Sequence, residues 1–176
     1  SRDWSSDVCS SDLIGQEDGW LGQSLFQGII NGKYEGAPPP IDLSNELKAG
    51  QLIRTLIREK KVFAVHDCSD GGLLVALAEM ALAGNIGVEI NPYIGSLPLQ
   101  ALWFGEDQGR YIIETTFETV DEIILRANLL ALPARILGVV KGDTLKFGAD
   151  EDPLPIEKLR LLQDRKSTRL NSSHVK

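Results

Sequence analysis

The segment at residues 62–84, VFAVHDCSDGGLLVALAEMALAG, constrains the fold more than any other part of the chain. Its pattern predicts a buried strand over 62–66, a tight turn at 67–69 and a helix over 70–83. The predicted helix is apolar on almost every side, and a helix of this kind has to be covered by other structure. We therefore expect it to lie against a β-sheet.

The rest of the chain alternates between helical and strand patterns. Further helices are expected from about residue 24 and over about 43–60, 119–130 and 152–163, and further strands over 86–90, 100–104, 110–115, 134–140 and 144–147. The strands 100–104 and 110–115 are expected to pair antiparallel, with GEDQG as their connection. The prolines of EGAPPPI at 35–41 favour a stiff extended connector. This order predicts an α/β (α+β) domain in which helices cover a mixed β-sheet.

The composition argues against three classes of protein: nucleic-acid-binding, membrane-spanning and zinc-binding. The 176 residues include 25 acids and 18 bases, a net charge of −7, which argues against a nucleic-acid partner. No apolar run approaches the roughly 18 residues of a membrane span. The cysteines, Cys9 and Cys68, match no zinc-binding spacing. A cytoplasmic protein is expected. Residues 14–163 contain a single cysteine, Cys68, and a lone thiol suits a reducing compartment.

Both ends of the chain can be encoded by the two strands of a single DNA element. DWSSDVCSSDL at 3–13 and DRKSTRLNSSH at 164–174 are translations of complementary strands, and that element resembles a sequencing adapter. We therefore expect residues 1–13 and 164–176 to be non-native tails. Residues 14–163 would then be one domain, truncated at both ends.

The SDGG corner is the strongest candidate for a binding site. Ser69 or Asp70 is expected to cap the following helix, whose first turn holds Gly71 and Gly72. Paired glycines are costly at a helix start unless a ligand or another backbone approaches there. Free N–H groups at that start favour an anion, so one interpretation is a phosphate or Mg²⁺-phosphate site. The other is a capped helix that packs closely, since Asp67 and Asp70 would repel a bare phosphate.

The same corner offers residues for two other chemistries. A metal site could use His66, Asp67, Cys68 and Asp70, but adjacent ligands of mixed type rarely converge on one ion. A Cys68–His66 nucleophile pair is disfavoured because the intervening turn separates the side chains.

Two more polar turns could contact a substrate. GEDQGR at 105–110 clusters Glu106, Asp107 and Gln108, which could hold a polar ligand or form a solvated hairpin turn. LGQS at 21–24 could cradle a substrate oxygen or simply cap a helix.

These segments together resemble a known enzyme family. HDCSDGGLLVALAEMALAG, LGQSLFQ…EGAPPPIDL and FGEDQGRYIIET are similar to the C-terminal part of phosphoribosylformylglycinamidine synthase, in its large synthetase subunit. The resemblance covers essentially all of residues 14–163. It implies the fold of the C-terminal domain of aminoimidazole ribonucleotide synthetase-related proteins, without its first strand and the end of its last helix.

The resemblance also implies an activity for the parent protein. Such a ligase uses ATP and Mg²⁺ to join ammonia, released from glutamine, to formylglycinamide ribonucleotide in purine biosynthesis. Its expected partners are a glutaminase subunit, a small accessory subunit and the missing N-terminal domains of the same chain. Those domains carry the catalytic histidine and most ATP and Mg²⁺ ligands. The resemblance therefore implies no catalytic residue here and an inactive isolated fragment.

Ten residues match motifs of the family and form the candidate substrate or nucleotide site. They are His66, Asp67, Ser69, Asp70, Gly71, Gly72, Gly22, Ser24, Glu106 and Gln108. Asp107 stands where the family's substrate-binding copy of the motif has serine, which implies a structural relic. Two alternatives stay open: a non-catalytic pseudo-domain, structural or nucleotide-holding, that supports the active half, and a free-standing metal hydrolase using His66 and Asp70.

Overall fold

The computed structural model describes residues 9–147 and 152–172, with side chains placed up to residue 164. Its strands and helices follow one another as β1 (Cys9–Ile14), α1 (Leu25–Asn31), α2 (Leu43–Arg58), β2 (Ala64–Asp67), α3 (Gly72–Gly84), β3 (Val88–Ile90), α4 (Leu99–Phe104), β4 (Tyr111–Thr116), α5 (Phe117–Leu129), β5 (Ala134–Val140), β6 (Thr144–Phe147), β7 (Leu154–Pro155) and α6 (Ile156–Ser172). The predicted α/β domain with a mixed sheet is confirmed.

The strands form one sheet in the order β2-β4-β1-β5-β3-β6-β7. β1 lies inside it and pairs antiparallel with β4 and with β5. The pair β3–β6 is parallel, whereas β2–β4, β3–β5 and β6–β7 are antiparallel. The sheet is therefore mixed, and β2 forms one of its edges.

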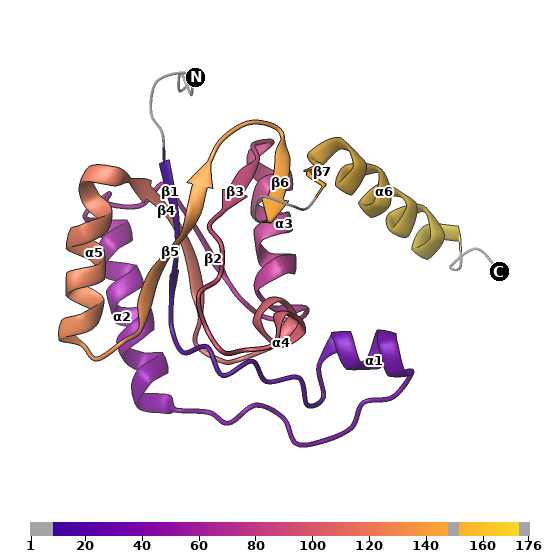
Figure 1. Cartoon of the computed structure of the whole chain (residues 1–176), viewed down its shortest axis with the longest axis horizontal. Helices are drawn as coiled ribbons and strands as arrows, with labels where there is room; N and C mark the ends of the chain where they lie inside the picture. Colours follow the sequence, from indigo (N-terminus) through magenta and orange to yellow (C-terminus); the bar gives the residue numbers. More distant parts are fainter. Residues whose placement is uncertain (1–8, 148–151, 173–176) are drawn as a thin grey trace.

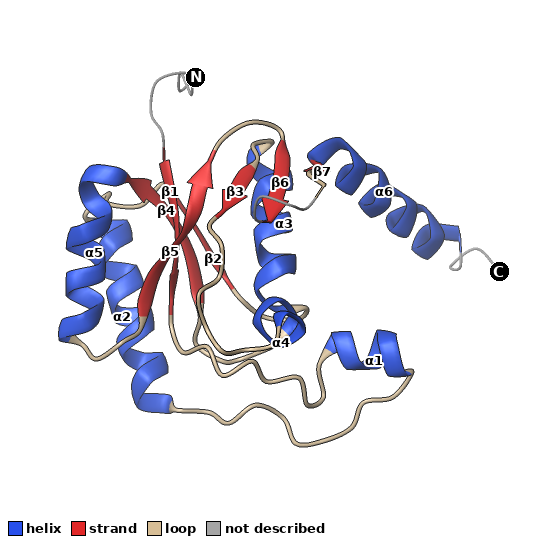
Figure 2. Ribbon diagram, in the orientation of Figure 1, coloured by secondary structure: helices blue, strands red, loops and turns tan. Residues whose placement is uncertain are grey.

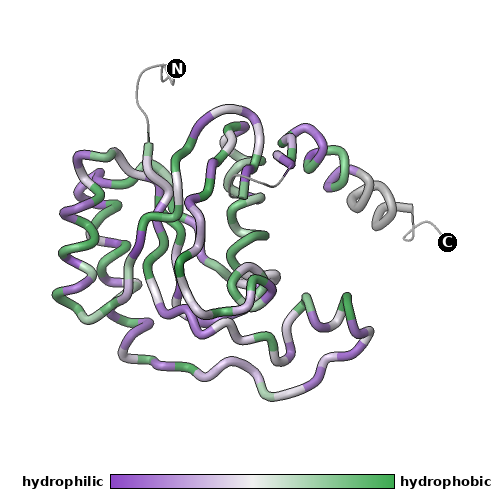
Figure 3. Tube along the Cα trace, viewed as in Figure 1, coloured by the Kyte–Doolittle hydropathy of each residue, from purple (hydrophilic) through white to green (hydrophobic). Residues whose placement is uncertain are grey.

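Helices cover both faces of this sheet (Figure 1, Figure 2). α2 and α5 pack on one face, where Leu56 and Ile123 belong to a shared core. α3 packs on the other face, where Leu73 and Leu77 belong to a second core. Figure 3 shows α3 apolar along most of its length, as expected for a helix that other elements cover.

Most predicted elements are confirmed, but the strand expected over 100–104 is wrong. These residues form helix α4, which begins after Pro98 and buries Ala101 and Leu102. A short apolar run fits either a helix or a strand, and here helical packing against α3 prevails. GEDQG is consequently a loop between α4 and β4 and not a hairpin turn.

The helices α2 and α3 are capped in different ways at their N-termini. Asp42 caps α2 by accepting a hydrogen bond from the backbone N–H of Asn45 at 3.0 Å. The expected cap of α3 by Ser69 or Asp70 is wrong, because its N-cap is Gly71 with a φ of 84° and no side-chain hydrogen bond. The start of α3 therefore depends on groups elsewhere in the fold.

Both segments expected to be tails contribute to described elements. β1 takes its residues from Cys9 to Ile14 and fills a middle position of the sheet, where the resemblance had implied a missing strand. α6 runs to Ser172, past the expected domain end at residue 163. The non-native origin of these residues stays a prediction.

Candidate functional site

The SDGG corner lies where the end of β2 meets the start of β4. The backbone N–H of Cys68 donates to the carbonyl of Arg110 at 2.9 Å. This bond extends the β2–β4 ladder by one residue and brings the 105–110 loop beside the start of α3. Two motifs separated by more than thirty residues thus form one corner.

Gly71 and Gly72 permit a close approach between these two segments. Both have positive φ, 84° and 71°. A Cβ built on Gly72 would lie 2.5 Å from the carbonyl oxygen of Gly105, a separation that no side chain tolerates. The paired glycines therefore serve packing against the loop that precedes β4.

The carboxylate of Glu106 occupies the start of α3. Its Oε1 accepts the backbone N–H of Gly71 at 2.8 Å and the backbone N–H of Leu25, the first residue of α1, also at 2.8 Å. The N–H of Gly72 donates to the carbonyl of Ser69. A carboxylate at a helix start is favourable because it meets free N–H groups and the positive end of the helix dipole. An anion of the protein itself thus takes the place considered for a phosphate.

Asp107, in the same loop, is buried. Its two carboxylate oxygens accept the backbone N–H groups of Gly19 at 3.0 Å and Trp20 at 2.8 Å. Its Oδ2 also lies 3.5 Å from Nη1 of Arg110, whose side chain is 1% exposed. The guanidinium of Arg110 donates in turn to the carbonyl of Gly105. Asp107 is therefore a structural anchor with its charge compensated.

The LGQS turn is held by the Pro-rich connector. A Cβ on Gly22 would lie 2.4 Å from the carbonyl oxygen of Ala37, so the connector passes directly over this glycine. Nε1 of Trp20 donates to the same carbonyl at 2.8 Å. Ser24 is fully buried and caps α1 by accepting the N–H of Gln27. The turn thus serves capping and packing.

The remaining candidates at the corner do not converge. His66 points its Nε2 toward Glu79 of α3, with 3.1 Å to the carboxylate oxygen, while Asp67, Ser69 and Asp70 are exposed. Over residues 9–147 and 152–164, no group of three or more His, Cys, Asp or Glu side chains is placed to hold a metal ion. Burial raises the pKa of the Cys68 thiol to about 11, which keeps it protonated at neutral pH and weakens it as a nucleophile.

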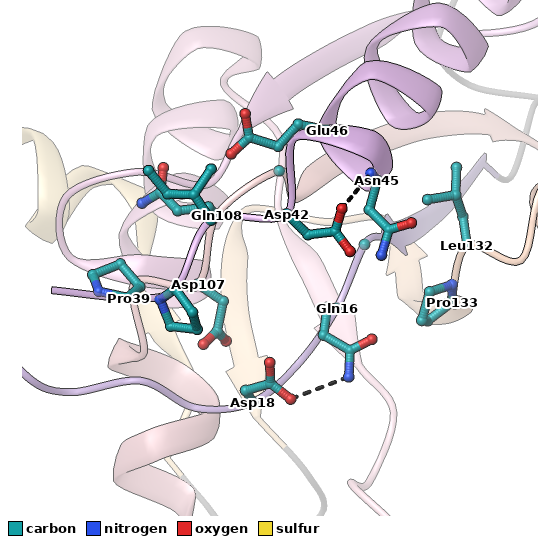
Figure 4. Close-up of a pocket in the computed structure, with 14 residues that line it drawn as sticks. Gln16, Asp18, Pro39, Asp42, Asn45, Glu46, Asp107, Gln108, Leu132 and Pro133 are labelled. Carbon is teal, nitrogen blue, oxygen red and sulfur yellow. Dashed lines mark hydrogen bonds between the residues drawn. The ribbon is translucent and has the colours of Figure 1, made fainter.

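Two cavities flank the 105–110 loop. The smaller, about 290 Å³, lies between the loop and the start of α2 and has Asp18, Asp42, Glu46 and Gln108 in its lining (Figure 4). Its carboxylates make it acidic.

The larger cavity, about 510 Å³, brings together five of the ten predicted site residues. These are Asp67, Ser69, Asp70, Glu106 and Gln108. Gly22, Ser24, His66, Gly71 and Gly72 are absent from the described lining. Sequence reasoning missed Arg54 and Arg110, which also line it. Arg110 could have been found as the base three residues after Asp107, directly before the apolar residues Tyr111–Ile113 that open β4.

Comparisons with known proteins agree with this architecture. The family described as "AIR synthase related protein, C-terminal domain" matches residues 13–149. Phosphoribosylformylglycinamidine synthase subunit PurL of Azorhizobium caulinodans is 41% identical over 148 residues, which are 84% of this chain and 20% of that protein. PurL of Methylocella silvestris is 47% identical over 133 residues, 76% of this chain and 18% of that protein. The chain thus spans about a fifth of the length of these relatives.

Solved structures share the fold. T. maritima PurL complexed with FGAR aligns with a TM-score of 0.71 at 18% identity, over 87% of this chain and 28% of that one. The hydrogenase maturation protein HypE of E. coli aligns with a TM-score of 0.56 at 20% identity, over 85% of this chain and 49% of that one. At these identities the alignments support the fold alone.

Proposed function

The chain belongs to the family of AIR synthase related proteins, through their C-terminal domain, and from this premise we propose that it is a fragment of a phosphoribosylformylglycinamidine synthase. The support is the identity of 41% and 47% to two proteins of that name. The parent protein would be a ligase of purine biosynthesis. It would use ATP to convert formylglycinamide ribonucleotide and glutamine-derived ammonia into formylglycinamidine ribonucleotide, ADP and phosphate.

Within that enzyme the proposed role of this domain is structural. The observation that carries this proposal is the engagement of both carboxylates of the GED sequence, Glu106 and Asp107, by backbone N–H groups and Arg110. A carboxylate committed to the fold is not free to bind a substrate or a metal. The domain would instead shape the surface against which the catalytic domains pack.

The described residues do not fit a magnesium site. Mg²⁺ requires several oxygen ligands in near-octahedral geometry, and no cluster of three carboxylate, imidazole or thiolate groups is found in the part of the chain that the structure describes. ATP and Mg²⁺ would therefore be handled by other domains of the parent protein. The same geometry argues against the metal hydrolase, because His66 faces Glu79 and not Asp70.

A nucleotide-holding pseudo-domain is the weaker alternative. The 510 Å³ cavity has room for a ligand, but its lining includes Glu46, Asp67, Asp70 and Glu106 beside Arg54 and Arg110. Arg110 is already paired with Asp107. A polyphosphate would meet more negative than positive charge there, which opposes its binding.

The partners proposed for the parent protein are a glutaminase subunit and a small accessory subunit, in the cytoplasm. The solved structure of PurLQS from T. maritima, which aligns with this chain at a TM-score of 0.64, supports an assembly with other subunits. No helix of the described residues is long and apolar enough to cross a bilayer.

The experiment that tests the proposal measures turnover and binding on the same preparation. The chain is mixed with formylglycinamide ribonucleotide, ammonium, ATP and Mg²⁺, and phosphate release is followed, with an intact relative as the positive control. Calorimetry then measures ATP binding with and without Mg²⁺. We expect no turnover and no ATP binding at millimolar concentration. Ammonia-dependent phosphate release would contradict the structural role, and ATP binding without turnover would favour the nucleotide-holding alternative.

A further inference from the structure

Residues 21–41 form a segment that adds almost nothing to the hydrophobic core. It contains α1, the turn after α1 and the Pro-rich connector, and Figure 1 shows α1 at the margin of the molecule. All of these residues are described by the structure, and Ser24 is the single buried residue among them. Segments with few buried contacts belong to the least stable parts of a folded domain. We therefore expect this segment to separate from the sheet at a low cost in free energy.

Contacts within the segment tie α1 to the connector. The backbone N–H of Gln23 donates to the carbonyl of Glu35 at 3.0 Å. The N–H of Glu35 donates in return to Oε1 of Gln27 at 3.1 Å. A Cβ on Gly28 would lie 2.4 Å from Cζ of Tyr34, so this ring packs against α1. Because these contacts hold its two halves together, the segment should move as one unit.

Two contacts pin α1 to the body of the domain. Oε1 of Glu106 accepts the backbone N–H of Leu25 at 2.8 Å. The ring of Phe26 stacks on the ring of Phe104, the last residue of α4, with 4.7 Å between the ring centroids. Leu25 is exposed and both rings are half-buried, so water replaces these contacts when they break.

The segment is anchored at both of its ends. Before it, the carboxylate of Asp107 accepts the backbone N–H groups of Gly19 and Trp20. After it, Asp42 caps α2 through the N–H of Asn45. None of these groups belongs to the segment, so the anchors remain when the pins at α1 break. The two ends can therefore act as hinges.

The connector forms part of the wall of both cavities at the candidate site. Pro39 lines both, and Pro40 and Ile41 line the smaller one as well (Figure 4). Glu46 and Gln108 are also common to the two linings, so the cavities adjoin one another. Moving the connector away would open them into one groove along the start of α2.

We propose that residues 21–41 are a hinged lid, which opens as one unit while the sheet and its covering helices stay folded, and which controls access to the groove beneath the connector. The structure shows the closed state, in which the pins at Leu25 and Phe26 are made. In the open state the groove exposes Cys68, which lines the 510 Å³ cavity and is 6% exposed when the lid is closed. Access to the groove then depends on the population of the open state.

The first measurement is hydrogen exchange of the full chain, resolved by residue. The amides of Gln23, Gly28 and Glu35 are bonded within the lid, so they should show the same protection. Amides in the middle of α5 should exchange on the order of 100-fold more slowly after correction for intrinsic rates, because they require opening of the core.

The second measurement is the rate at which N-ethylmaleimide labels Cys68, followed by mass spectrometry of peptides. Opening of the lid should set this rate, because Cys68 is reached through the groove. Cys9, in the middle of the sheet and 2% exposed, is the internal control. Its labelling does not depend on the lid and should be unchanged by the variants below.

Leu25→Pro removes one pin and leaves the helix intact. Leu25 is the first residue of α1, where proline is favourable, and Ser24 before it already has the extended backbone that a proline requires (φ −74°, ψ 157°). The substitution deletes the N–H that Glu106 accepts. Lid exchange and Cys68 labelling should both accelerate roughly threefold to tenfold. Leu25→Ala keeps this N–H and is the matched control, with an expected change below about twofold.

Phe104→Ala removes the other pin from the side of the body. We expect lid exchange and Cys68 labelling to accelerate on the order of tenfold, because the ring of Phe26 loses its stacking partner. Phe117→Ala removes an exposed ring at the start of α5 and should change neither rate. Circular dichroism checks that each variant is folded.

Two results would overturn the proposal. One is exchange of the α1 amides together with those of α5, which would mean that the segment opens only when the domain unfolds. The other is equal labelling of Cys68 in Leu25→Pro and Leu25→Ala, which would mean that the pin to Glu106 does not hold the lid closed.

Discussion

Oε1 of Glu106 lies 2.8 Å from the backbone nitrogen of Gly71, so a side chain from the loop before β4 supplies the missing cap of α3. The same oxygen accepts the N–H of Leu25 at the start of α1. One carboxylate thus joins two helix starts that lie far apart in the sequence. The residue types that suggested a ligand site are those that a helix start requires from its own protein.

Removing this carboxylate should destabilise the domain. Glu106→Ala leaves the N–H groups of Gly71 and Leu25 without their acceptor, and we expect the free energy of unfolding to fall by about 1–3 kcal/mol. Urea unfolding followed by circular dichroism measures it. Glu157→Ala, at an exposed position in the first turn of α6, is the matched control and should change stability by less than about 0.5 kcal/mol. Equal losses in the two variants would contradict the capping role.

Because Gly72 lies so close to the Gly105 carbonyl, alanine should destabilise the domain more at Gly72 than at Gly142. Gly72→Ala adds a Cβ within 2.5 Å of the Gly105 carbonyl and strains a φ of 71°. Gly142→Ala strains a similar φ of 67° but has nothing within 4 Å of its Cβ. We expect about 1 kcal/mol of destabilisation for Gly142→Ala and at least about 2 kcal/mol more for Gly72→Ala. Thermal unfolding of both variants measures the difference, and similar midpoints would show that backbone strain alone matters at Gly72.

The buried pair of Asp107 and Arg110 gives the largest expected loss. Asp107→Ser leaves the guanidinium of Arg110 buried without a counter-charge and the N–H groups of Gly19 and Trp20 without acceptors. Breaking one side of a buried pair costs about 3–5 kcal/mol. Chemical denaturation should therefore find this variant largely unfolded or strongly destabilised, while the exposed Asp121→Asn serves as the control. A stable Asp107→Ser variant would mean that this loop tolerates the serine found in the family's substrate-binding copy of the motif.

How far the sequence predicts this structure depends on the range of the interactions. The apolar periodicity of α2 and α5 and the apolar run of α3 are local signals, and each predicted its element. The strand expected over 100–104 failed because α4 lies against α3 and buries Ala101 and Leu102, which is a tertiary effect. A local pattern cannot reveal such a contact.

In the candidate site, too, the local motifs were predictable from the sequence and the long-range contacts were not. The SDGG and GEDQ motifs do lie together, but which groups they bind depended on contacts between distant segments. Glu106 reaches residue 25 from 81 positions away in the chain, and no local pattern predicts that partner. β1 is the opposite case: its polar sequence carries no strand signal, and its neighbours β4 and β5 determine its conformation.

The buried carboxyl group of Asp12 predicts an unusual dependence of stability on pH. Its pKa is about 7 in the folded chain and 3.8 when exposed, so the folded state binds the proton more tightly than the unfolded state. This contribution is fully present below pH 3.8 and is lost progressively as pH rises to about 7, to a total of at most about 4 kcal/mol. In Asp12→Val this fall should disappear. Urea unfolding of both proteins at pH 5, 6, 7 and 8 measures it; parallel profiles would contradict burial of this carboxyl group, because the two proteins differ only at the group that titrates.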